Sequence, residues 1–452
     1  MLLLLIPYAA VLILAIFELS GALSNRAIRT PSCSAWFWMF AIVVSYGIQL
    51  LLMRYAATHA TPLKPWRLSM PVPALHIVVW HGKLVSAAFL VAGGAQSYAL
   101  LALYRSRVSR TIVAAGFAIL VVMSVLAPAL ASFDSYLYAW ASVAGTRAWL
   151  AAPVPLSGDF HVIDLWFGKP GAFLAYGPLW FVIVHLVCAL PATLLGKILA
   201  LRVFGALLMA SLLIAMRALG LPRRFLTVTA LNPGLMFQFV ANAHNDLIAI
   251  LIVTLAAAVI RRSPTAGVGL IAVAGLVKIP FVLLGLPVLA VLRPAARTRY
   301  VGGVAAIVAV LVVSWLGGGS AYWQALTYHA TVSRAQTMLH VLPVFLAIAA
   351  IAVAFAGGRR LISANWLIPA IGGFGLPVIF PWYLIWALPY GLARHRVLGA
   401  LLVAFPFATA ALVQELPLEW AFFFAIPLAV VVAYRTPARL VQAFSRGESA
   451  SG

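Results

Sequence analysis

Long apolar runs recur along almost the whole of this 452-residue chain, and they constrain its fold more than any other feature. Many of these runs are long enough to cross about 30 Å of hydrocarbon as an α-helix. Hydrophobic residues make up 65% of the chain, and the mean hydropathy is +1.09. A soluble domain of this size could not bury so much apolar surface. The sequence therefore predicts an all-α, polytopic integral membrane protein.

The predicted architecture is a single polytopic transmembrane domain over residues 1–452, with roughly 13 to 15 membrane segments, several of them short and broken by proline. The apolar run at residues 1–22 lacks a basic region at its start, so we expect a membrane span there rather than a cleaved signal. Cys33 and Cys188 both lie in or beside apolar segments, and we expect no disulfide framework.

The formal net charge of +22 comes from arginines and lysines that lie mainly in short gaps between apolar runs. This placement is typical of membrane orientation signals and does not favour nucleic acid as a partner. We expect the basic gaps to be cytoplasmic and to lie close to anionic lipid headgroups. They include Arg105–Arg110, Arg217–Arg224, Arg261–Arg262, Arg394–Arg396 and the tail at 435–452.

The gaps that are poor in lysine and arginine are expected on the exterior side, and the largest is the loop at residues 132–176. This topology fits the chain from Arg217 onward but leaves one misfit before it. Residues 177–195 have to form a partial or interfacial helix, so that residues 201–219 can run inward to Arg223.

Acidic side chains are rare, and most of them fall on the predicted exterior side. Of the eight in the chain, six do so: Asp134, Asp159, Asp164, Asp246, Glu415 and Glu419. Ionisable groups at membrane depth are costly and usually functional. Acids gathered at one face favour an exterior active site, since a proton-coupled transporter would carry them nearer mid-membrane. A transporter or flippase for a lipid-linked glycan, and a structural membrane subunit, remain alternatives.

Asp134 lies in the stretch FDSYLYAW (133–140), which follows a long apolar run and opens the exterior loop. A carboxylate in this place could act as a general base on a lipid-borne substrate, or it could cap a helix. The aromatic residues beside it, including Tyr138, could form a platform for a sugar or an aromatic belt at the interface.

A second polar cluster, Asn242–Asp246, stands out in a chain with only 8% charged residues. Asn245 or Asp246 could cap the next helix, while His244 could bind a phosphate oxygen or orient a carboxylate. Lys278 interrupts the apolar run 271–292 near its predicted exterior end. It could neutralise a departing lipid phosphate or extend to the interface.

Other candidates lie later in the chain. Arg334 is a further phosphate-binding candidate, and Trp382 and Tyr383 could stack on a sugar or prenyl chain or belong to an aromatic belt. No phosphate-binding Gly-rich loop and no CxxC pair is present. The exterior acids could gather around a divalent metal, but their spacing does not require one.

Six motifs in order along the chain resemble the GT-C membrane glycosyltransferases, especially the bacterial polyprenyl-phosphate-mannose-dependent α-mannosyltransferases. They are FDSYLYAW (133–140), YGPLW (176–180), LNP (231–233), AHND (243–246), LVKIP (276–280) and PWYLIW (381–386). Asp134 lacks the adjacent acidic partner that many members of this superfamily carry, so metal dependence does not follow from the resemblance.

The resemblance implies an inverting transfer of a sugar, mannose foremost, from a polyprenyl-phosphate donor to a glycolipid or glycan acceptor. It places the site on the exterior face of a bacterial inner (plasma) membrane. Asp134 would be the base, and Lys278, with His244 or Arg334, would stabilise the leaving phosphate. Asn245 and Asp246 would hold the donor or His244, and Tyr138, Trp382 and Tyr383 would shape the sugar and lipid groove.

Overall fold

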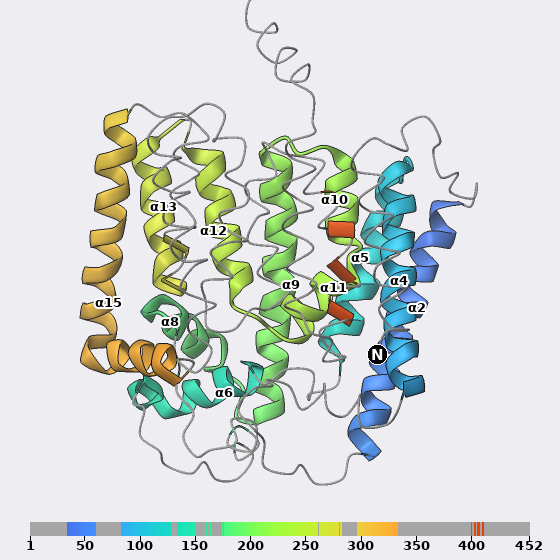
Figure 1. Ribbon diagram of the computed structural model, residues 1–452, viewed down its shortest axis with the longest axis horizontal. Helices are drawn as coiled ribbons and strands as arrows, with labels where there is room; N and C mark the ends of the chain where they lie inside the picture. Colours follow the sequence, from blue (N-terminus) through green and yellow to red (C-terminus); the bar gives the residue numbers. More distant parts are fainter. Residues whose placement is uncertain are drawn as a thin grey trace, which may run out of the picture.

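The computed structural model describes residues 34–59, 83–127, 134–149, 176–260, 262–279, 281–282 and 296–332, with a few single positions at 160–174 and 399–410. Within this part of the chain every regular element is a helix (Figure 1). They are α2 (Ala35–His59), α4 (Lys83–Arg105), α5 (Arg110–Val125), α6 (Asp134–Ala144), η2 (Gly145–Trp149), α8 (Pro178–Val187), α9 (Leu194–Ala218), α10 (Arg223–Ala230), α11 (Pro233–Leu235), η4 (Met236–Ala241), α12 (Asp246–Val259), α13 (Pro264–Val277) and α15 (Ala296–Val332).

Four of the described helices are long and apolar enough to cross a membrane, and they confirm the predicted all-α membrane character. The qualifying stretches are Ala35–Arg54, Ala87–Arg105, Leu194–Ala218 and Tyr300–Ala325. A fifth span results if the bent pair Pro233–Ala241 and Asp246–Val259 is counted as one. The larger number of segments predicted from the sequence involves residues that the structure does not describe.

The longer helices stand side by side, while α6 and α8 lie at one end of them (Figure 1). Helices α12 and α13 form an antiparallel hairpin whose turn contains Arg262. Asp246 begins α12 and Lys278 follows the last residue of α13, so both lie at the opposite end of the hairpin from Arg262. Arg262 is thus separated from Asp246 and Lys278 by the length of the hairpin, as expected from the sequence, and which end faces the exterior remains a prediction.

The segment that the sequence singled out as a topological misfit contains a short helix. Helix α8 has only 10 residues, and α9 starts anew after an N-cap at Thr193, whose side chain accepts a hydrogen bond from Gly196 N. The predicted partial helix is therefore confirmed. The loop predicted at 132–176 also contains helices, since α6 and η2 lie within it.

One apolar helical segment in the middle of the molecule is interrupted. Helix η4 is a π-helix, and the segment Pro233–Ala241 meets α12 at 111°. The connecting residue Ala243 has φ 55°, a left-handed conformation that residues other than glycine rarely adopt. Broken helices and π-helical turns are tolerated within membrane proteins where other groups satisfy the backbone, and they often mark functional sites.

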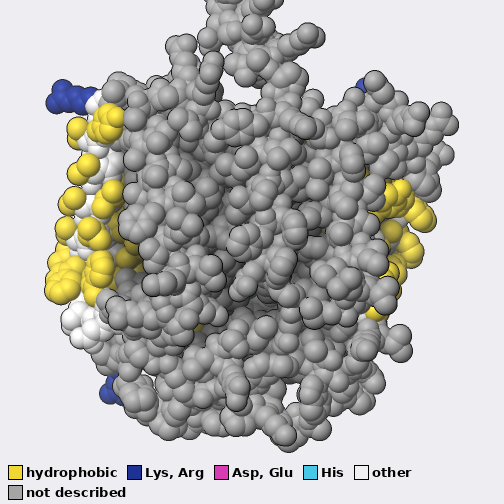
Figure 2. All heavy atoms as spheres, in the orientation of Figure 1, with side chains coloured by type: hydrophobic (Ala, Val, Ile, Leu, Met, Phe, Trp, Pro, Cys, Tyr) yellow, Lys and Arg dark blue, Asp and Glu magenta, His cyan; other side chains and the backbone are white. Residues whose placement is uncertain are grey.

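Large apolar side chains remain exposed on the outermost helices. Figure 2 shows apolar surface along opposite edges of the molecule. On α15, Leu316 is 77% exposed, and on α2 Phe40 is 63% exposed. Apolar surface of this extent needs an apolar environment, which a lipid bilayer supplies.

Candidate functional site

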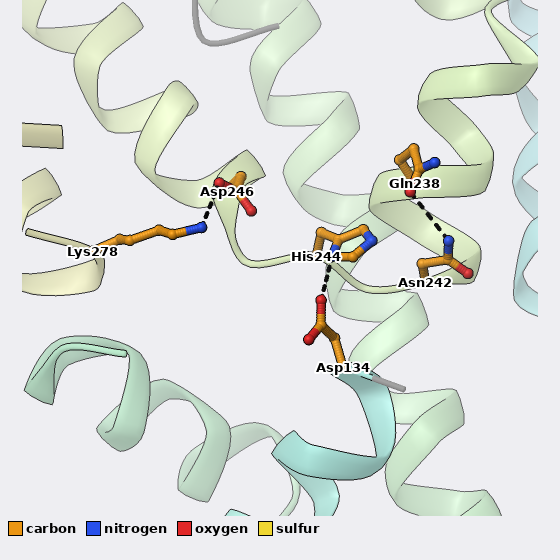
Figure 3. A network of polar contacts seen from close by, with 6 residues as sticks. All are labelled: Asp134, Gln238, Asn242, His244, Asp246 and Lys278. Carbon is orange, nitrogen blue, oxygen red and sulfur yellow. Dashed lines mark hydrogen bonds and ion pairs between the residues drawn. The ribbon is translucent and has the colours of Figure 1, made fainter. Parts of the chain in front are cut away.

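Asp134 and His244 form the first of two ion pairs at the break in the apolar segment (Figure 3). Asp134 begins α6, and His244 lies in the connection between η4 and α12. The imidazole Nδ1–H donates to Asp134 Oδ2 across 2.6 Å. A charge-assisted contact this short fixes both the carboxylate and the ring.

Local structure around the break holds His244 in this position. Asn242 Nδ2 donates to Gln238 Oε1 over 3.2 Å, and the Asn242 backbone N–H donates to Phe237 O over 2.9 Å (Figure 3). The left-handed backbone at Ala243 then turns the chain. Such a conformation costs about 1–3 kcal/mol and is retained where the surroundings demand it, often at functional sites.

Lys278 and Asp246 form the second pair. The Lys278 ammonium donates to Asp246 Oδ1 across 3.1 Å, and Lys278 is the C-cap residue that follows α13. Asp246 lies in the first turn of α12, where a negative charge is favoured by the helix dipole. Lys278 is therefore paired with Asp246, and both roles considered for it from the sequence, neutralising a lipid phosphate and extending to the interface, remain predictions.

The two pairs are held next to each other by the chain itself. Only Asn245 separates His244 from Asp246, so their Cα atoms lie within about 7.6 Å of each other. Each pair also has one deeply buried member and one more accessible member. The His244 and Asp246 side chains are 5% and 2% exposed, whereas those of Asp134 and Lys278 are 16% and 14% exposed. A carboxylate and an ammonium group are thus each oriented by a buried partner.

Asn245 occupies the N-cap position of α12 but makes no capping hydrogen bond with its side chain. The residue is 1% exposed, and among the described residues neither Asn245 Oδ1 nor Nδ2 has a hydrogen-bond partner. Buried polar atoms are nearly always satisfied, so this amide is unusual. Of the two roles considered for Asn245, side-chain capping is not observed, and binding of the donor remains a prediction.

An aromatic wall brings two of the sequence motifs together beside the polar cluster. Tyr138 of α6 is fully buried and makes edge-to-face contacts with Trp180 and Tyr176, at centroid distances of 4.9 and 5.5 Å. Burial raises the pKa of the Tyr138 phenol well above its ordinary value, and the charge of Asp134 acts in the same direction. The neutral form of the phenol is therefore favoured. The contact of Tyr138 with a sugar remains a prediction.

Gly177 packs against the backbone of the two residues that precede Lys278. The Gly177 N–H donates to Val277 O over 2.9 Å, and a Cβ atom at Gly177 would collide with the carbonyl oxygen of Leu276. The preceding ring, that of Tyr176, has its centroid 5.5 Å from the Lys278 ammonium. The start of α8 and the end of α13 can meet this closely only because residue 177 has no side chain.

The structure thus brings Asp134, Tyr138, His244, Asp246 and Lys278 into one region, with Asn245 between the two pairs. Arg334, Trp382 and Tyr383 lie outside the described residues, as do Asp159 and Asp164, and their proposed roles remain predictions. Among the residues that the structure describes, no group of three or more His, Cys, Asp or Glu side chains is arranged to hold a metal ion. The possibility of a divalent metal remains untested.

Sequence reasoning did not identify Arg202 or the supporting role of Gly177. Arg202 is a basic residue inside the long apolar run of α9, and a buried cation in such a run is a recognisable signal of function. The requirement for glycine at position 177 had no comparable signal, because it depends on a contact with the distant Leu276.

Comparison with known proteins gives no assignment: no family model, curated protein or solved structure matches this chain.

Proposed function

We propose that this protein is a membrane glycosyltransferase that moves a sugar from a polyprenyl-phosphate donor to a hydroxyl group of a glycolipid or glycan. The proposal rests chiefly on one observation. Two oppositely charged and more accessible groups, Asp134 and Lys278, are each oriented by a buried partner, and those partners are separated by a single residue. Transfer from a lipid phosphate needs a base for the acceptor and a cation for the leaving group.

In the proposed reaction the Asp134 carboxylate accepts the proton of the acceptor hydroxyl. The acceptor oxygen forms a bond to the anomeric carbon of the sugar while the bond from that carbon to the phosphate oxygen breaks. The polyprenyl phosphate leaves with the bonding electron pair, and a single displacement inverts the configuration. His244 holds the carboxylate in one orientation through its Nδ1–H.

Lys278 stabilises the negative charge that develops on the departing phosphate. Asp246 holds the ammonium near His244 and Asp134, so that the cation is in place before the reaction begins. Such preorganised charge contributes to catalysis because it needs no rearrangement as the reaction proceeds. We assign the sugar as mannose and the location as the exterior face of a bacterial inner membrane, following the motif resemblance.

One observation favours a second candidate, a transporter or flippase for a lipid-linked glycan. The apolar segment that carries the site is broken, with an angle of 111° between its two parts. Transporters commonly bind their substrates at discontinuous helices of this kind. The same polar pairs would then hold the lipid phosphate and sugar without chemistry.

Mass spectrometry of membrane glycolipids, from cells with and without the protein, tests the proposed function. The proposal predicts a glycolipid or glycan that is heavier by one sugar only when the protein is present. Purified protein in liposomes then separates the two candidates. Formation of a new glycosidic bond from a synthetic polyprenyl-phosphate sugar supports the transferase. Movement of the labelled lipid across the bilayer with no new bond supports the flippase.

A further inference from the structure

Arg202 is buried within α9, one of the helices long enough to cross a membrane. The residue is only 1% exposed, although the surrounding run is apolar. An arginine in such a place is costly unless its N–H groups are satisfied. The groups that accept hydrogen bonds from Arg202 therefore indicate its role.

The Arg202 guanidinium bonds to backbone carbonyl groups from two separate helices. Its Nε–H donates to Ala241 O over 2.8 Å, and Nη1 donates to Val125 O and Ala127 O over 3.1 and 2.6 Å. Ala241 is the last residue of η4, and Val125 is the last residue of α5. Carbonyl groups at helix C-termini lack partners within their own helix and carry the negative end of its dipole. One cation thus joins two helix ends.

In the chain, each of these helix ends precedes one of the two segments that carry the first ion pair. From Ala241 the chain passes through Asn242 and Ala243 to His244, and from Ala127 it passes through residues 128–133 to Asp134. Through these bonds Arg202 holds the end of η4, three residues before His244, next to the end of α5.

A second contact fixes the same helices. A Cβ atom at Gly205, three residues along α9 from Arg202, would collide with the carbonyl oxygen of Phe239 in η4. Helix α9 is thus seated closely on η4, with glycine at the point of contact and the Arg202 guanidinium beside it. Movement of η4 away from α9 would have to break the bond from Arg202 to Ala241.

We propose that Arg202 is a positioning residue that sets His244 against Asp134. This inference rests on the proposed function for its effect on sugar transfer, but its structural part does not. Arg202 acts through the backbone carbonyl groups of two helix ends.

A double-mutant cycle distinguishes this role from general support of the fold. The variants are Arg202→Lys, His244→Ala and the two combined, with Arg217→Lys as the matched control, because Arg217 is exposed in the last turn of the same helix. Lysine keeps the charge but lacks the planar group that reaches several carbonyls at once. A misplacement of about 1 Å in an active site can lower the rate on the order of 10²-fold.

We expect Arg202→Lys to lower kcat by at least about tenfold with a smaller change in the KM for the donor, and Arg217→Lys to change neither. In the His244→Ala background, Arg202→Lys should have almost no further effect on kcat. Losses in kcat that multiply in the combined variant would overturn the proposal. If Arg202→Lys does not fold, Arg202→Gln replaces it in the cycle, because the glutamine amide can still donate to Ala241 O.

Thermal unfolding of the wild type, the two single variants and the combined variant separates failure of this inference from failure of the proposed function. If the wild-type protein transfers no sugar, the cycle is evaluated from Tm instead. Arg202 as a positioning residue predicts that the Tm loss caused by His244→Ala shrinks in the Arg202→Lys background. Tm losses that simply add would show that Arg202 supports the fold independently of His244, and would overturn the inference.

Discussion

His244 Nδ1 lies 2.6 Å from Asp134 Oδ2, and this contact joins the first turn of α6 to the break in the apolar segment before α12. The histidine is the more buried member of the pair. An imidazole in this position orients the carboxylate and leaves Asp134 as the member nearer to solvent. We therefore assign the chemistry to Asp134 and a supporting role to His244.

Replacing His244 by alanine should lower kcat on the order of 10²-fold while the protein remains folded, because Asp134 loses the donor that orients it. Steady-state kinetics on purified protein measures the change. His185→Ala is the matched control, since the His185 ring contacts a backbone carbonyl in α8 and has no part in the proposed reaction. A His244→Ala protein as fast as the His185→Ala protein would contradict the orienting role.

Replacing Lys278 by methionine should destabilise the protein by about 3–5 kcal/mol, because it leaves the Asp246 carboxylate buried without its cation. Adding Asp246→Leu removes that uncompensated charge and should restore much of the stability. Sugar transfer should stay low in both proteins, since neither has a cation for the leaving phosphate.

Unfolding in detergent gives the stability of these variants, and a transfer assay gives their activity. Equal stability of the Lys278→Met protein and the wild type would show that the ion pair does not matter to the fold. Restored transfer in the double variant would show that the leaving phosphate does not need Lys278.

Replacing Gly177 by alanine should destabilise the protein by about 1–3 kcal/mol, because the new Cβ collides with the carbonyl of Leu276, next to the backbone that presents Lys278. Transfer should fall as well. Gly269→Ala is the control: Gly269 lies in α13, the helix that contains Leu276, with open space around it, and the substitution should stabilise the protein by about 0.5–1 kcal/mol. Melting temperatures that move in the same direction for both variants would argue against the proposed contact.

The helical membrane architecture could be predicted from the sequence because apolar runs and basic gaps are local signals. The opposite placement of Arg262 and Lys278 on the α12–α13 hairpin follows from the same signals, as does the short helix at 178–187. The polar positions at the site were also recognisable, because an apolar chain has few of them.

The pairing of these positions could not be predicted in the same way. Asp134 could as well have met Lys278, and only the three-dimensional path of the chain assigns it to His244. The π-helical turn and the left-handed Ala243 leave no mark in an apolar pattern. Arg202 was visible as a basic residue within an apolar run, but its carbonyl partners lie at the ends of two other helices.

Sugar transfer by the Asp134→Asn protein decides whether Asp134 is the base of the proposed reaction. The substitution keeps the size of the side chain and removes its ability to accept a proton as a carboxylate. With a synthetic polyprenyl-phosphate sugar and an acceptor found by glycolipid mass spectrometry, we expect the rate to fall on the order of 10²–10⁴-fold, while the donor still binds. An Asp134→Asn protein that transfers sugar as fast as the wild type would contradict the assignment of Asp134 as the base.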